Sequence, residues 1–341
     1  MPAIGSGFRS LAAGVLALVL LAVPAAAQPA QGSESARPAP IRALDAVVRV
    51  RSVVPGDARS ARTLGAERDG SGVVIDAEGL VLTIGYLIVE AESVTITLNG
   101  GRTVAARPVA YDHDSGFGLL RAVSPLGVKP VELGSSAKLG ARDRVWVASH
   151  GGADMAMPAL VVSRRTFAGP WEYLLDEAIF TTPPHPAFGG AALLDDGGRL
   201  VGVGSLIVGD AAGPEQPLSG NMFVPVDRLK PILGDMLERG RSAGPPHPWL
   251  GMAAQELHGR LMVTRVTEGG PADKAGIRPG DLVLGVGGEA VDGLDGFYRK
   301  VWAVGAAGVA VPLNVLQGIR VEPILVHSVD RYDFLRLGRS Y

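Results

Sequence analysis

Histidines, hydroxyls and carboxylates decide whether this chain can perform acid–base chemistry. The chain has 341 residues with 6 histidines and no cysteine, which excludes thiol catalysis, disulfides and cysteine-bound zinc. His113, His150 and His185 show no metal-ligand spacing, and we interpret them as loop or surface histidines. We therefore expect no metal and no cofactor.

Short strands are the elements expected to position these side chains. From Arg42 to about Leu237, short apolar runs alternate with Gly, Asp and Asn, a pattern typical of strands and turns. Residues 93–98 alternate in polarity and end at Asn99-Gly100, a hairpin signal. Strands are also expected at 144–148, 160–162 and 200–207. Closely spaced strands without amphipathic helices between them predict antiparallel barrels or a sandwich, and residues 226–240 predict a closing helix.

Four stretches occur in a fixed order: residues 70–89, 111–120, 186–203 and 220–226. In order and spacing they resemble the HtrA (DegP-like) family of trypsin-like serine proteases with PDZ domains, and the resemblance covers about residues 42–329. It implies a mainly β protein, with a trypsin-like double β-barrel followed by one PDZ domain of the α+β class. The proline- and glycine-rich stretch 240–248 predicts the linker between them.

The resemblance places the catalytic His, Asp and Ser of the family on Tyr86, Gly116 and Gly189. Acyl transfer on this scaffold needs a hydroxyl nucleophile, a base and an orienting carboxylate. A phenol, with a reference pKa of about 10, is a poor base at neutral pH, and glycine has no functional group. We therefore expect no catalytic residue. The oxyanion-loop equivalents are Ala187, Phe188 and Gly189, where Ala187 replaces a family glycine.

A relocated triad is the alternative to lost chemistry. His113 and Asp114 lie near the position of the family Asp, and His185 lies near the nucleophile loop, but none lies near Tyr86 in sequence. No serine occurs between Ser163 and Ser205, and Thr181 and Thr182 precede the loop. Tyr86 and Phe188 are interpreted as filling the space left by the lost polar groups, or, in the case of Phe188, as part of a surface that binds polypeptide.

The C-terminal unit resembles a PDZ domain, most specifically in residues 270–284. A helix at 294–304 is expected beside a groove in which a peptide adds a strand and its carboxylate meets backbone N–H groups. Departures from the family at 305–308 and 317–320 weigh against binding, and the helix face could be plain core. The residues assigned to peptide binding are Trp249, Leu250, Gly251, Met252, Leu294, Phe297 and Val301.

The N-terminus predicts export. Arg9, the apolar run 11–23 and Ala25-Ala26-Ala27 form a signal peptide cleaved after Ala27, unless the segment stays as an anchor. The domain prediction is signal peptide 1–27, flexible leader 28–41, trypsin-like domain 42–239, linker 240–248, PDZ domain 249–329 and tail 330–341, docked or free. Localisation is predicted to be periplasmic, without a membrane span after cleavage.

Three functions remain open. The first is a pseudoprotease that binds unfolded or C-terminal polypeptide segments in the bacterial envelope as a holdase, adaptor or regulator. The second is an active endopeptidase with a non-standard site, and Thr181 or Ser205 would be the hydroxyls to test. The third is a structural subunit without peptide binding, in a mixed oligomer with an active paralogue, and the partners would then be the chain itself or an HtrA paralogue. A net charge of -2 argues against nucleic acid as a partner.

Overall fold

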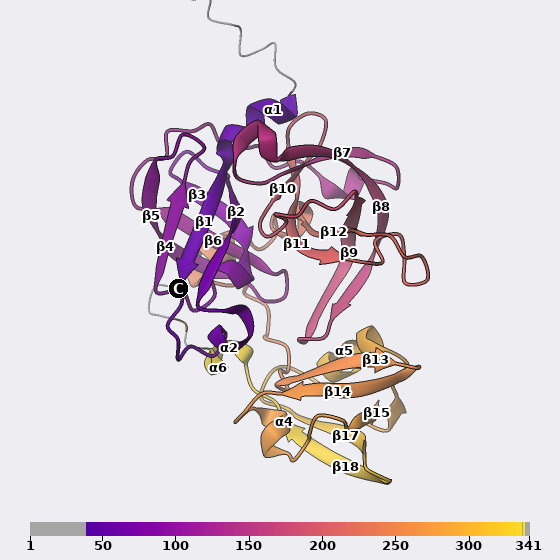
Figure 1. The fold of residues 1–341 in the computed structure, drawn as a ribbon. Helices are drawn as coiled ribbons and strands as arrows, with labels where there is room; N and C mark the ends of the chain where they lie inside the picture. The colour runs from indigo at the N-terminus through magenta and orange to yellow at the C-terminus, as the bar shows by residue number, and fades with distance from the viewer. Residues whose placement is uncertain (1–38, 336, 338–341) are drawn as a thin grey trace, which may run out of the picture. The chain divides into compact units, whose positions relative to one another are not determined.

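The computed structural model describes residues 39–335 and residue 337 of the chain. These residues form two closed antiparallel barrels of six strands each and a further antiparallel sheet (Figure 1). The prediction of a mainly β fold is confirmed. The predicted signal peptide 1–27 and most of the predicted leader lie outside the described residues.

The first barrel follows the order β1-β2-β3-β6-β5-β4. Its strands are β1 Val47–Val53, β2 Glu67–Val74, β3 Leu80–Ile84, β4 Ser93–Thr97, β5 Thr103–Tyr111 and β6 Phe117–Ala122. The inward residues of β3 and β6, such as Leu82 and Leu119, pair in register and are fully buried. Since β4 pairs with β1, the barrel closes without an open edge.

The second barrel follows the order β10-β11-β12-β9-β8-β7, and β10 pairs with β7. Its strands are β7 Arg144–Ala148, β8 Ala156–Gly169, β9 Tyr173–Thr182, β10 Ala192–Leu194, β11 Leu200–Val208 and β12 Gly220–Pro225. The strand expected at 160–162 is the middle of the much longer β8. The pairing of β8 with β9 continues to Gly169 and Tyr173, which makes a long hairpin with its turn at residues 170–172.

The third sheet has the order β13-β14-β15-β17-β18, with β16 paired to β15. Its strands are β13 Met252–Leu257, β14 Arg260–Val266, β15 Leu282–Val286, β16 Glu289–Ala290, β17 Ala310–Gln317 and β18 Arg320–His327. Two helices, α4 Pro271–Lys274 and α5 Leu294–Ala303, accompany it. β13 is an edge strand, so one side of its backbone is open to pairing with another segment.

The remaining helices are short, and one differs from the sequence prediction. They are α1 Ala39–Ala43, α2 Ala61–Leu64, α3 Leu233–Arg239 and α6 Arg331–Phe334, with 3-10 turns at Leu44–Ala46, Gly85–Leu87, Ser136–Lys138, Gly152–Met155 and Val226–Arg228. The helix predicted over 226–240 is wrong in extent. Pro231 lies inside it and lacks the N–H that a continuous helix needs. The leader predicted through 41 also ends earlier, because α1 starts at Ala39.

Candidate functional site

Tyr86 is held between the barrels by the loop that follows β3. The guanidinium of Arg68, which is 5% exposed, donates from Nη1 to the carbonyl oxygens of Tyr86 at 2.7 Å and Val89 at 2.9 Å. The Gly85 N–H donates to the Gly116 carbonyl oxygen at 2.7 Å. These bonds fix the backbone of the 3-10 turn, and its aromatic side chain lies toward the second barrel.

The Tyr86 hydroxyl fills the space beside Gly189. It donates to the Ser205 carbonyl oxygen at 3.0 Å, and a Cβ atom on Gly189 would lie 2.8 Å from the phenol oxygen. Burial raises the pKa of Tyr86 above its ordinary value. The phenol is therefore a neutral hydrogen-bond donor at neutral pH, and the position beside it has room for a glycine alone.

Gly116 has a left-handed backbone with φ +81°, a conformation that L side chains rarely adopt. A Cβ atom there would lie 3.0 Å from the Tyr173 hydroxyl, which donates to the Ser115 carbonyl oxygen at 3.0 Å. The structure thus brings Gly116 beside the turn that carries Tyr86, through the Gly85 bond. It leaves little room for a carboxylate at position 116.

One backbone donor of the predicted oxyanion loop, the Ala187 N–H, is bonded within the chain. The N–H of Ala187 donates to Nδ1 of His185 at 3.1 Å, and Nε2 of the same ring lies 3.2 Å from the Met155 carbonyl oxygen. Burial lowers the pKa of His185, so the ring is neutral and accepts this bond. Phe188 is half-buried, and the Gly189 carbonyl oxygen accepts from the Ser71 N–H at 2.8 Å. An oxyanion would have to displace the imidazole from Ala187.

A serine–histidine pair spans the two barrels, and no motif in the sequence pointed to it. The Ser71 Oγ lies 3.2 Å from His150 Nδ1 and accepts from the His150 backbone N–H at 3.0 Å. Burial lowers the pKa of His150, which suits a base. Ser71 is fully buried, however, and within residues 39–335 no carboxylate is hydrogen-bonded to the ring. The pair lacks both access and an orienting acid.

The hydroxyls weighed as substitutes lie in strands or pack inward. Thr181 is fully buried in β9, and its Oγ1 has no hydrogen-bond partner among the described atoms. Ser205 is 5% exposed, and the Thr182 hydroxyl donates to the Ser219 carbonyl oxygen at 2.9 Å. In the described part of the chain, none of these hydroxyls is hydrogen-bonded to a histidine.

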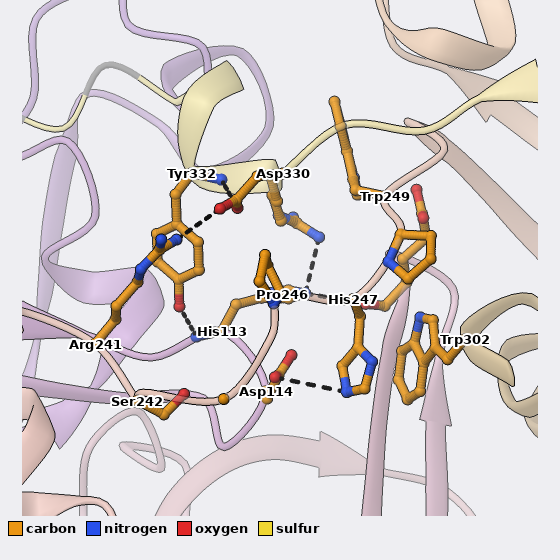
Figure 2. Close-up of a pocket in the computed structure, with 14 residues that line it drawn as sticks. His113, Asp114, Arg241, Ser242, Pro246, His247, Trp249, Trp302, Asp330 and Tyr332 are labelled. Atoms are coloured by element: carbon orange, nitrogen blue, oxygen red, sulfur yellow. Dashed lines mark hydrogen bonds and ion pairs between the residues drawn. The ribbon is translucent and has the colours of Figure 1, made fainter. Parts of the chain in front are cut away.

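His113 and Asp114 line a small cavity together with linker residues (Figure 2), and Tyr86 is not among the residues that line it. Asp114 lies 3.7 Å from the His247 ring, which stacks on Trp302 with 4.2 Å between ring centroids. The His113 backbone N–H donates to the Tyr332 hydroxyl at 2.8 Å. The cavity of about 30 Å³ has room for about one water, so these contacts fasten the linker and the tail.

The tail, for which the sequence left docking open, is held by α6. Asp330 pairs with Arg241 at 2.7 Å and caps α6 by accepting from the Tyr332 N–H. The Phe334 ring packs on Trp249 with 4.6 Å between centroids, and the Arg59 guanidinium carbon lies 3.7 Å from the Phe334 ring centroid. The tail residues up to Phe334 therefore contact both the first barrel and the start of the third-sheet unit.

Three successive backbone N–H groups before and at the start of β13 converge on one carboxylate. Leu250, Gly251 and Met252 donate to the Glu172 oxygens at 2.8, 2.7 and 3.0 Å. Burial raises the pKa of Glu172 to about 7, while Arg331 and the three N–H groups oppose this shift. The loop thus binds a carboxylate, that of Glu172 in the β8–β9 turn. The sequence analysis did not identify this turn as part of the site.

The other residues assigned to peptide binding separate into different environments. Phe297 and Val301 are each 1% exposed and lie in the core of the third-sheet unit. Leu294 lines a groove of about 400 Å³ together with Thr166, Ala168, Pro170, Gln255, Glu256 and Asp295. The residue of α5 that meets the β8–β9 turn is Tyr298, which donates to the Gly169 carbonyl oxygen at 2.8 Å. The helical periodicity of the sequence did not distinguish Tyr298 from the other residues of this helix.

The described residues contain neither a candidate metal cluster nor a candidate membrane span. No group of three or more His, Cys, Asp or Glu side chains could hold a metal ion. Among the same residues, no helix has the length and apolar character needed to cross a bilayer.

Two barrels with a junction loop, followed by a sheet with a carboxylate-binding loop, define a trypsin-fold protein with a PDZ domain. A family model for the trypsin-like peptidase domain matches residues 70–203, and a PDZ domain model matches residues 262–302. The two domains, together with DegP-like and HhoA relatives, support an HtrA-family protein. This agrees with the resemblance in sequence and with the predicted domain types.

Curated relatives and solved structures support this assignment. A probable periplasmic DegP-like serine endoprotease of Hahella chejuensis is 25% identical over 66% of this chain and 50% of its own length. The putative serine protease HhoA of Synechocystis is 26% identical over 76% of this chain and 70% of its own length. The chain spans about half the length of the DegP-like relatives it matches.

Among solved structures, the HtrA-type protease AlgW with a decapeptide gives a TM-score of 0.52 at 19% identity, covering 87% of this chain and 98% of that one. A serine endoprotease of Yersinia pestis gives 0.50 at 19% identity, covering 86% and 96%. At this identity the likeness concerns the fold.

Proposed function

We propose that this chain is a non-catalytic HtrA-family protein that binds polypeptide segments in the bacterial periplasm. The observation that carries the proposal is the Tyr86 hydroxyl, which lies 2.8 Å from where a side chain on Gly189 would begin. The predicted signal peptide and relatives named as periplasmic endoproteases support the compartment.

The chemistry at the junction supports the loss of proteolysis. The position aligned with the nucleophile is a glycine, the position aligned with the base is a partly buried neutral phenol, and the Ala187 N–H is bonded to an imidazole. Removing the members of a triad lowers the rate by several orders of magnitude. With the Ala187 N–H bonded to the imidazole, one donor to the oxygen of a tetrahedral intermediate is lost and the stabilisation of that intermediate is reduced.

The PDZ unit supports polypeptide binding. Its edge strand β13 and the N–H groups of Leu250, Gly251 and Met252 provide the parts that bind a peptide by strand addition. The AlgW structures that share this fold contain peptides. We propose unfolded or C-terminal polypeptide segments as partners, with self-assembly or assembly with an HtrA paralogue as further possibilities.

An endopeptidase with a different nucleophile is the second candidate, because Ser71 and His150 form a hydrogen-bonded pair across the junction. The full burial of Ser71 opposes it, since a substrate carbonyl needs access to the attacking oxygen.

A fluorophosphonate probe and a casein-cleavage assay on the purified chain distinguish these functions. We expect neither labelling nor cleavage under conditions in which trypsin shows both. Labelling that disappears in Ser71→Ala would establish the second candidate. Binding is tested with a fluorescein-labelled decapeptide pool, randomised at its last four positions, against the same pool with amidated C-termini. We expect the free-carboxylate pool alone to bind.

A further inference from the structure

The turn of the β8–β9 hairpin occupies the groove of the PDZ unit in the way a bound peptide would. The Pro170 carbonyl oxygen accepts from the Ala254 N–H on edge strand β13 at 3.2 Å, and the Glu172 carboxylate accepts from the carboxylate loop. A PDZ domain binds its ligand through two elements. One is a backbone hydrogen bond to the edge strand, and the other is a carboxylate held in the carboxylate loop. Here both come from one segment of the same chain.

Helix α5 closes on the same turn from the other side. The Tyr298 hydroxyl donates to the Gly169 carbonyl oxygen at 2.8 Å and accepts from the Glu172 N–H at 3.0 Å. Arg299 pairs with Asp176 farther along β9. Leu174, which is 8% exposed, belongs to the hydrophobic core cluster of the PDZ unit. Apolar burial, ion pairing and backbone bonds therefore act together on the hairpin.

The tail holds the turn from a third direction. Nη1 of Arg331 donates to the Trp171 carbonyl oxygen at 2.9 Å, and Nε2 of His113 lies 2.9 Å from the Glu172 carbonyl oxygen. Arg331 also lowers the pKa of the Glu172 carboxyl, against the effect of burial. The carbonyl oxygens of Trp171 and Glu172 thus have partners within the chain.

The backbone of Glu172 adds an independent observation. Its φ is 58°, in the left-handed region, which costs a residue other than glycine about 1–3 kcal/mol and persists where the surrounding structure enforces it. Glu177 on the same hairpin has a φ of 59°, but its carboxylate pairs with Arg164 at 3.3 Å and is 68% exposed. Of the two, only Glu172 aims its carboxylate into the loop.

We propose that the hairpin tip, residues 169–172, is an intramolecular ligand of the PDZ groove, with Glu172 in the subsite of a C-terminal carboxylate. An external peptide then binds only after the tip has left the groove. The proposal of competition rests on the proposed peptide-binding function, whereas the docking of the tip does not. The docked tip further means that this groove binds the carboxylate of a side chain as well as that of a C-terminus.

Hydrogen exchange on the full chain tests the docking without any peptide. The amides of residues 250–254 are compared in the wild type, Glu172→Ala and Glu177→Ala, the last a matched control with the same residue type, the same hairpin and the same backbone region. We expect Glu172→Ala to exchange at least tenfold faster at these amides, and Glu177→Ala to match the wild type. Glu172→Gln, which retains one acceptor oxygen, should lie between them.

Equal exchange in the wild type, Glu172→Ala and Glu172→Gln would overturn the docking. Titration of the same variants with the free-carboxylate decapeptide pool then tests competition, and we expect at least tenfold tighter binding to Glu172→Ala than to the wild type or Glu177→Ala. If the amides of residues 250–254 exchange faster in Glu172→Ala but no variant binds the peptide pool, the docked tip is supported and the proposed peptide-binding function is refuted. Tight and equal binding to all three chains refutes the competition and leaves the peptide-binding function standing.

Discussion

The phenol oxygen of Tyr86 and the Cα of Gly189 exclude any larger residue at position 189, because a Cβ there would lie 2.8 Å from that oxygen. The two residues come from different barrels, and the Tyr86 hydroxyl is anchored on the Ser205 carbonyl oxygen of β11. The glycine at position 189 and the phenol at position 86 are therefore coupled by space, and each residue fits the other.

Gly189→Ser should destabilise the protein without producing a nucleophile. Forcing the new Cβ against the phenol oxygen is expected to lower the free energy of unfolding by about 1–3 kcal/mol, as in other overpacked sites. Gly189→Ala should show the same loss, since the contact arises at Cβ. Urea denaturation measures both.

The coupling itself is tested by Tyr86→Phe, which removes the oxygen. In the Tyr86→Phe background we expect Gly189→Ser to lower the free energy of unfolding by less than in the wild type. The difference between the two losses is the interaction energy of a double-mutant cycle. Additive effects of the two substitutions would contradict the close contact.

Restoring all three triad residue types should not restore proteolysis. Gly116 has φ +81°, and a Cβ there would lie 3.0 Å from the Tyr173 hydroxyl, so an aspartate would be strained and would not reach the orienting position. We expect the combined variant Tyr86→His, Gly116→Asp, Gly189→Ser to cleave no casein. Gly116→Ala, the matched control for the backbone, should lower stability by about 1 kcal/mol or more. Casein cleavage by the combined variant would show that position 116 accommodates the acid.

Tyr298→Phe should loosen the hairpin tip. It removes the donor to the Gly169 carbonyl oxygen and the acceptor for the Glu172 N–H, and each buried group left unpaired costs about 1–3 kcal/mol. We expect faster hydrogen exchange at the amides of 250–254. Tyr86→Phe, which deletes another buried hydroxyl, serves as the control and should leave those amides protected. The prediction fails if both variants affect the groove equally.

The stability of the docked tip should decrease as the pH rises. Burial raises the pKa of Glu172 to about 7 from its ordinary value of 4.5. The docked state therefore binds more protons than the undocked or unfolded state between these two pH values. The stabilisation is complete below about pH 4.5 and is lost as the pH rises through about 7. The loss is on the order of 3 kcal/mol, at about 1.4 kcal/mol for each pH unit.

Thermal unfolding of the wild type and Glu172→Gln between pH 4.5 and 8 measures this effect, because the glutamine does not titrate. The groups that face Glu172 are Arg331, Tyr298 and His113, and burial lowers the pKa of His113 well below its usual value. Their titration is common to both proteins and cancels in the difference. A difference in stability that does not vary with pH would contradict the raised pKa.

The sequence was sufficient for the architecture, whereas the loss of catalysis at the junction stays a prediction. Ordered Gly-rich motifs place Tyr86 and Gly189 in loops at fixed distances from strands, so their meeting followed from the fold. The helix over 226–240 was wrong in extent, because Pro231 interrupts a period that otherwise looks helical.

The contact between the β8–β9 turn and the carboxylate loop could not be predicted from the sequence. Glu172 meets Leu250 across 78 positions of the chain, and nothing local to residues 170–173 indicates a ligand. Helical spacing grouped Leu294 with Phe297 and Val301, but a period cannot separate a groove from a core that share one face. Tyr298 was missed for the same reason.

Leu174 is part of the PDZ hydrophobic cluster although it belongs to β9. A fragment cut at the linker would therefore lose one of its own core side chains and expose an apolar surface beside an empty carboxylate loop. Such a fragment is a different receptor from the intact chain, and affinities measured on it would overstate how readily the full-length protein accepts a peptide.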